Sequence, residues 1–168
     1  MASNSLFKTR SGVNYFLPIV LVTLCFALLG FANYITNPMV KAFSKIFRMS
    51  VADGALVQLA FYGGYFAMAL PAALFIRKFS YKSGIVMGLG LYALGALLFI
   101  PAGQIGLYYP FLIAYFIMTC GLSFLETSAN PYILSMGESS QATRRLNLAQ
   151  AFNPIGSLLG MFVAMEFI

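Results

Sequence analysis

The chain has 168 residues, of which 61% are hydrophobic and only 8% are charged. Soluble domains have about 25% charged residues, so this composition indicates a protein that crosses a membrane several times. The formal net charge of +6 would suggest nucleic-acid binding in a soluble protein. Here the basic residues lie between long apolar runs, where they set the orientation in the bilayer instead.

The first apolar run follows a short basic tail. Residues 1–14 contain Lys8 and Arg10 and are expected to form a cytoplasmic tail. Residues 15–39 are long enough for a transmembrane helix, which needs about 20 residues. A signal peptide is a weaker alternative, because the apolar stretch is longer than the apolar region of such a peptide. We therefore predict a first helix that remains in the membrane.

Four further helices are predicted, and their short connections make consecutive helices antiparallel neighbours. The interval between Lys82 and Glu126 has no charge and is too long for one span. A stretch rich in proline and glycine at residues 101–110 breaks it into two. The predicted helices cover residues 54–75, 84–101, 107–135 and 144–168. Residues 15–168 as a whole are therefore expected to form an all-α membrane bundle.

The distribution of Lys and Arg predicts the orientation of this bundle. If the N-terminus is cytoplasmic, seven basic residues lie inside and three lie outside. Cytoplasmic loops carry the excess of positive charge, so the N-terminus is predicted to face the cytoplasm, in a multi-pass protein of the inner membrane. The inside residues are Lys8, Arg10, Arg77, Lys78, Lys82, Arg144 and Arg145, and the outside residues are Lys41, Lys45 and Arg48.

Glu126 is the only charged residue between Lys82 and Glu138. A carboxylate at membrane depth costs roughly 2.5–3.5 kcal/mol on insertion scales, so it marks an ion pathway or proton relay by default. The alternative is a protonated acid that only hydrogen-bonds a neighbouring helix. The sequence predicts a proton-carrying role for this residue.

Polar amides recur beside proline on three of the predicted helices. Proline removes a backbone hydrogen bond, and in lipid the freed carbonyl needs another partner. Helical spacing of three or four residues places the amides of each helix on one face. Amides donate and accept hydrogen bonds and therefore suit the hydroxyls of a sugar. The alternative is contact between helices, at about 0.6 kcal/mol each. The candidate cavity-lining residues are Asn33, Asn37, Asn130, Asn147, Gln150 and Asn153.

Other kinds of site have little support in the sequence. Cys25 and Cys120 both fall inside apolar runs, so neither a disulfide nor a metal site is expected. Histidine is absent, and no second acid or nucleophile–base pair accompanies Glu126, which disfavours an intramembrane enzyme. No cofactor is expected.

Several blocks of sequence resemble a known transporter family. The most distinctive are Leu-Glu-Thr-Ser-Ala-Asn-Pro at residues 125–131 and Arg-Leu-Asn-Leu-Ala-Gln-Ala-Phe-Asn at residues 145–153, with further similarity at residues 56–66, 71–84 and 90–96. In these blocks the chain resembles the N-terminal half of a major facilitator superfamily transporter. The resemblance is specifically to the fucose–galactose–glucose:proton symporter family.

This resemblance implies proton-coupled import of L-fucose or a related hexose by alternating access, with a cavity between two halves. A carboxylate of the fourth helix takes part in proton coupling in that family, and Glu126 occupies the matching position. Gln150 and Asn153 match cavity-lining positions. The family's first-helix acid is replaced by Asn37 and its tryptophan by Leu29, so coupling rests on Glu126 alone, or is altered or absent.

The sequence stops inside the fifth predicted helix, whereas a complete member has two halves. Our first interpretation is an incomplete half of a sugar symporter, whose missing half or another chain completes the cavity. Its expected partners are a small sugar, a proton and the lipid bilayer, without nucleic acid. The alternative is a membrane interaction protein that does not transport and pairs with itself or with a partner half through its glycine-rich faces.

Overall fold

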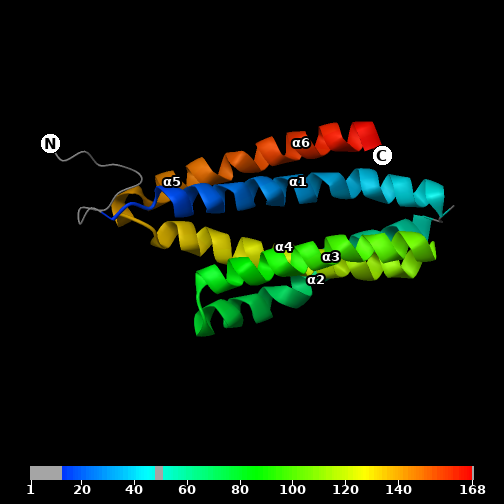
Figure 1. Cartoon of the computed structure of the whole chain (residues 1–168), viewed down its shortest axis with the longest axis horizontal. Helices are drawn as coiled ribbons and strands as arrows, with labels where there is room; N and C mark the ends of the chain where they lie inside the picture. Colours follow the sequence, from blue (N-terminus) through cyan, green and yellow to red (C-terminus); the bar gives the residue numbers. More distant parts are fainter. Residues whose placement is uncertain (1–12, 48–50, 168) are drawn as a thin grey trace. The chain divides into compact units, whose positions relative to one another are not determined.

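The computed structural model describes residues 13–47 and 51–167 (Figure 1). The predicted tail at residues 1–14 lies almost entirely outside the described residues. The described residues contain five candidate membrane spans, which confirms the predicted all-α membrane fold; α5 and α6 both belong to the fifth. The elements are α1 (Phe16–Ile46), α2 (Val51–Lys78), α3 (Tyr81–Ile105), α4 (Tyr108–Ser135), the 3₁₀ turn η1 (Ser139–Gln141), α5 (Ala142–Gln150) and α6 (Phe152–Phe167).

Several helices extend beyond the apolar runs that predicted them. The first was expected to end at residue 39, but α1 continues through Pro38 to Ile46. The third was expected at residues 84–101, but α3 begins after an N-cap, where the Ser80 side chain accepts a hydrogen bond from the Ser83 N–H. It ends at Ile105, before the C-cap residue Gly106, whose φ of 67° is the left-handed conformation that glycine adopts easily. Capping thus sets both ends of α3.

The helix expected at residues 144–168 is divided in two. α5 ends at Gln150, Ala151 lies in a turn, and α6 begins at Phe152. Pro154 has no N–H to donate to the carbonyl of Gln150, so the regular ladder is interrupted at this point.

The chain forms two compact units, which are described separately. In the described residues, the first unit contains residues 13–35 and 129–167, and the second contains residues 36–47 and 51–128. Helices α1 and α4 each contribute to both units.

In the second unit, α4 packs against both α2 and α3. Its Ser123 hydroxyl donates to the Tyr65 carbonyl of α2 at 3.2 Å, and the Tyr108 hydroxyl donates to the Asp53 carbonyl at 2.6 Å. On the α3 side, a Cβ on Gly95 would lie 2.5 Å from the backbone nitrogen of Met118. Small residues let the two backbones approach this closely where lipid supplies no hydrophobic force.

In the first unit, α6 runs beside α1, and both start at the same end (Figure 1). Their backbones meet at Gly30 and Gly156, where an added Cβ would overlap the carbonyls of Asn153 and Ala27, respectively. The Ser157 hydroxyl lies 3.1 Å from the Gly30 carbonyl and 3.2 Å from the Asn153 carbonyl, which are its two possible acceptors. The glycines and this serine therefore fix the contact between the helices.

Arg145 is buried under the turn between α4 and α5. Its side chain is 1% exposed, and Nη1 donates to the Glu138 carbonyl at 2.9 Å. A Cβ on Gly137 would lie 3.2 Å from Nη1, so the absence of a side chain there leaves room for the guanidinium. Arg145 thus stabilises the turn by packing against it and by its hydrogen bond to the Glu138 carbonyl.

We expect Arg145→Ala to destabilise the first unit by about 1–3 kcal/mol, because the Glu138 carbonyl loses its donor and the packing under the turn is removed. The adjacent Arg144 is exposed, so Arg144→Ala should change stability by no more than about 0.5 kcal/mol. Unfolding by sodium dodecyl sulfate in mixed micelles, followed by circular dichroism, measures both variants. Equal stability of the two would contradict a structural role for Arg145.

The two cysteines, Cys25 and Cys120, are buried and not joined by a disulfide. Cys25 belongs to the first unit and Cys120 to the second. As expected from the sequence, both lie inside membrane spans.

Candidate functional site

The first unit contains a pair of hydrogen-bonded amides. Gln150 Nε2 donates to Asn130 Oδ1 at 2.9 Å. Asn130 lies near the end of α4, directly before Pro131, and Gln150 is the last residue of α5. The turn between these helices therefore brings together two residues that the sequence predicted only on separate helix faces. Asn130 is half-buried and Gln150 is exposed.

Asn153 lies where α6 crosses α1. A Cβ on Gly30 would be 3.0 Å from Asn153 Oδ1, so the amide lies against the glycine. The Asn153 side chain is half-buried. The amide of Asn153 therefore packs partly against Gly30 of α1 and is partly exposed.

Three further candidate residues do not belong to the amide pair. Asn33 on α1 and Asn147 on α5 are exposed side chains of the first unit. The side chain of Asn37 lies outside the part of the chain that the structure describes. The face predicted for Asn147, Gln150 and Asn153 crosses the break at Ala151, so its members belong to two helices.

Glu126 lies on α4 in the second unit, one helical turn before Asn130. Its side chain is exposed, although the five preceding residues, 121–125, are all buried. The acid therefore projects away from the packed side of α4.

The sequence did not single out Arg145 or the hydroxyls on α4. Arg145 was expected to be a cytoplasmic charge at the start of the block at residues 145–153, yet its side chain is buried. Thr119 and Ser123 are also buried, and both face α2: the Thr119 hydroxyl lies 3.4 Å from the Ala60 carbonyl and bonds its own helix at Phe116 at 2.9 Å. Their four-residue spacing on one face was the available signal.

The amide residues of this site can form hydrogen bonds. Among residues 13–47 and 51–167, no three His, Cys, Asp or Glu side chains gather where they could hold a metal ion. Amides can both donate and accept hydrogen bonds, so they are suited to a neutral polyhydroxylated solute.

Several known proteins are similar to this chain in sequence. The L-fucose-proton symporter of Haemophilus influenzae is 58% identical over 154 residues, covering 92% of this chain and 36% of that protein. The Escherichia coli L-fucose-proton symporter is 41% identical over 155 residues, covering 92% and 35%. A glucose/galactose transporter of Brucella abortus is 37% identical over 150 residues, covering 89% and 36%. The chain thus spans about a third of the length of the curated relatives it matches.

A solved structure agrees with these matches. The crystal structure of the E. coli fucose:proton symporter superposes with a TM-score of 0.77 at 40% identity, and the match covers 92% of this chain and 37% of that one. The resemblance to sugar:proton symporters drawn from the sequence is therefore confirmed. The family model of the Major Facilitator Superfamily matches residues 22–168, and the chain belongs to this superfamily.

Proposed function

We propose that this chain takes part in proton-coupled import of L-fucose or a related hexose by alternating access, as one part of the wall around a central cavity. The observation that carries this proposal is the 58% identity to an L-fucose-proton symporter. The bonded amides of Asn130 and Gln150 support it, because they are suited to sugar hydroxyls. In such transporters the substrate site lies between two repeats that rock around it.

The amide pair of Asn130 and Gln150 can form hydrogen bonds with a sugar. The bond between Gln150 and Asn130 uses only one of the two hydrogens on Gln150 Nε2 and leaves Oε1 of that amide with its own accepting capacity. A sugar hydroxyl both donates and accepts hydrogen bonds, so one amide can bind it either as a donor or as an acceptor. In our proposal Asn153, Asn147, Asn33 and Asn37 line the same cavity.

Glu126 carries the proton in this proposal. It is the acid of α4, and an ionisable residue inside a membrane span marks an ion pathway by default. Asn37 stands where the symporter family has an acid, and an amide does not carry a proton. Glu126 is therefore the single proton-linked acid of this segment.

The proposed setting is the inner membrane with the N-terminus in the cytoplasm. Seven basic residues then lie on the inside and three on the outside. This excess follows the positive-inside rule.

The test grafts the sequence into a complete symporter. Residues of this chain replace the matching segment of the H. influenzae protein, and uptake of radiolabelled L-fucose is measured in proteoliposomes with an imposed proton gradient. We expect uptake by this chimaera and a rise of about two- to tenfold in KM for Gln150→Ala, since a hydrogen bond to a neutral partner contributes roughly 0.5–1.5 kcal/mol.

The control is Gln104→Ala, which removes an exposed amide of α3 in the second unit. It should leave KM unchanged. An unaltered KM for Gln150→Ala would reject the sugar contact, whereas a chimaera that folds but transports no hexose would reject the function itself.

A further inference from the structure

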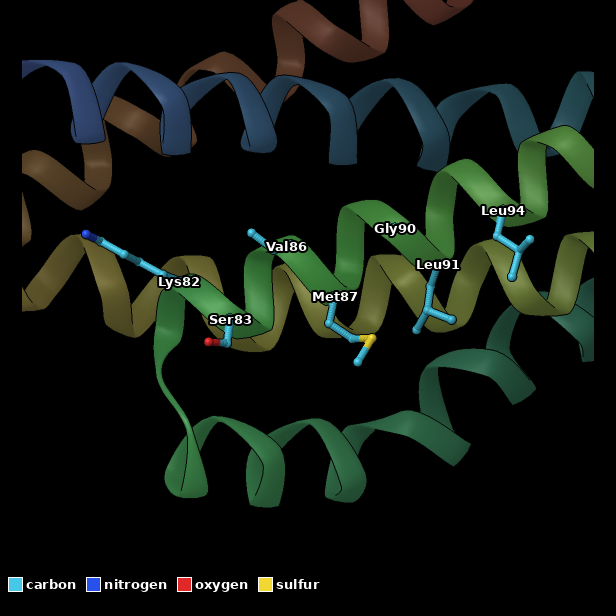
Figure 2. Close-up of a pocket in the computed structure, with 7 residues that line it drawn as sticks. All are labelled: Lys82, Ser83, Val86, Met87, Gly90, Leu91 and Leu94. Atoms are coloured by element: carbon cyan, nitrogen blue, oxygen red, sulfur yellow. The ribbon is translucent and has the colours of Figure 1, made fainter.

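A groove of about 590 Å³ runs along α3 in the second unit. Lys82 and Ser83 line one end of the groove, and the rest is lined by glycine and apolar side chains. Figure 2 shows Ser83, Met87, Leu91 and Leu94 on one side of the helix, with Lys82 extending outward at the start of the helix. The residues that line the groove are Lys82, Ser83, Val86, Met87, Gly90, Leu91 and Leu94.

The polar end of the groove lies at a membrane surface. One candidate span ends at Lys78 and the next begins at Tyr81, so the turn between them marks the edge of the hydrocarbon. Arg77, Lys78 and Lys82 are exposed there, and the sequence has no acidic residue between Asp53 and Glu126. Clustered cations at such an edge attract anionic headgroups.

A second polar group stands beside Lys82. The Ser83 and Ser80 hydroxyls bond each other at 2.9 Å, and this bond uses only one of their two protons. Ser83 is therefore a second polar residue that lines the groove, next to Lys82 in the sequence.

The length of the groove matches one leaflet of a bilayer. From Lys82 to Leu94 the helix rises about 18 Å, at about 1.5 Å per residue. Half of a hydrocarbon core of about 30 Å is about 15 Å. A transmembrane helix seated on α3 would follow its 25 residues from end to end, whereas the groove stops near the middle. An acyl chain of one leaflet has the matching extent.

We propose that this groove binds an anionic phospholipid, with the phosphate at Lys82 and one acyl chain along Val86, Gly90 and Leu94. Gly90 makes the floor of the groove, since a Cβ there would have nothing within 4 Å. An apolar chain covers this floor and the side chains beside it, and the cation selects the headgroup. Lipid binding here requires no sugar transport.

The experiment is photolabelling of the purified chain in phosphatidylcholine nanodiscs. The probes are phosphatidylglycerol and phosphatidylcholine that each carry a diazirine in the acyl chain, and labelled peptides are mapped by mass spectrometry. We expect residues 86–94 to be labelled about fivefold more by phosphatidylglycerol, because each basic residue near the surface strengthens attraction of an anionic lipid by about this factor.

Two variants separate the headgroup from the acyl chain. Lys82→Gln should lower the preference for phosphatidylglycerol by about fivefold and retain basal labelling, whereas Gly90→Leu should remove labelling of residues 86–94 by both probes. The matched controls are Lys45→Gln, an exposed lysine of α1, and Gly103→Leu, an exposed glycine of α3 whose Cβ would meet only Phe111, at 4.0 Å. Both should behave like the unaltered chain.

The same labelling is repeated on the chimaera with the H. influenzae symporter. Equal headgroup preference in both proteins supports the proposal. Labelling of the chain alone but not of the chimaera would overturn it and identify a protein segment as the occupant. Labelling that Gly90→Leu leaves unchanged, or that shows no headgroup preference, would overturn it as well.

Discussion

Replacing Glu126 by glutamine is expected to abolish concentration of the sugar while leaving sugar exchange intact. Glutamine keeps the size and the hydrogen-bonding capacity of the side chain but cannot take up or release a proton. Only the coupling to the proton gradient should therefore be lost. The exposed position of Glu126 on α4, away from the packed side of the helix, makes a loss of folding unexpected.

The expected effect is large. One proton moving through about 100 mV releases about 2.3 kcal/mol. That energy supports a sugar gradient of about 50-fold, since 1.4 kcal/mol corresponds to a factor of ten. The measurement is the steady-state ratio of L-fucose inside and outside proteoliposomes containing the chimaera, with an imposed potential. We expect a ratio of about 50 for the unaltered protein and about 1 for Glu126→Gln.

Counterflow of labelled sugar, which needs no net proton movement, should remain in the variant. Glu166→Gln is the control, because it removes another exposed carboxyl without affecting α4. If the Glu126→Gln variant concentrates sugar as strongly as the unaltered protein, the assignment of the proton site is wrong. Loss of both concentration and counterflow would instead point to a role in binding the sugar.

Replacing Gly156 by valine is expected to separate α6 from α1 and to lower stability by about 3 kcal/mol or more, at the upper end of the cost of overpacking. A Cβ at this position would lie 2.6 Å from the carbonyl carbon of Ala27. The obstacle is backbone rather than a flexible side chain, so relief requires a shift of the whole helix.

Gly103→Val is the matched control, since both substitutions place the same β-branched residue in a helix. Its Cβ would meet only Phe111 Cζ, at 4.0 Å. Unfolding of the chain in mixed micelles by sodium dodecyl sulfate, followed by circular dichroism, compares the two. If the variants unfold at the same detergent fraction, the close contact of α1 and α6 does not stabilise the chain.

The membrane spans were predictable because length and apolar character are local properties of the sequence. The ends of the helices were less so. α1 continues past Lys41 and Lys45, since backbone hydrogen bonds persist beyond the apolar run, and the start of α3 depends on a cap at Ser80. A charge therefore marks the edge of the hydrocarbon more reliably than the end of a helix.

The candidate site was predicted as separate faces rather than as contacts. Spacing placed Asn130 and Gln150 on their own helices, but their hydrogen bond depends on how the chain turns between α4 and α5. That turn contains Gly137 with a φ of 65° and rests on the buried side chain of Arg145. A sequence pattern shows neither the path of a turn nor which arginine it covers.

The two buried cysteines give each unit a chemical reporter of its own. A thiol shielded by its neighbours reacts with a maleimide only when the surrounding helices open, so its rate of alkylation measures local opening. Cys25 reports on the unit that holds the amide pair, and Cys120 on the unit that holds Glu126. The natural sequence thus allows the opening of the two units to be timed independently, in one sample and without an engineered label.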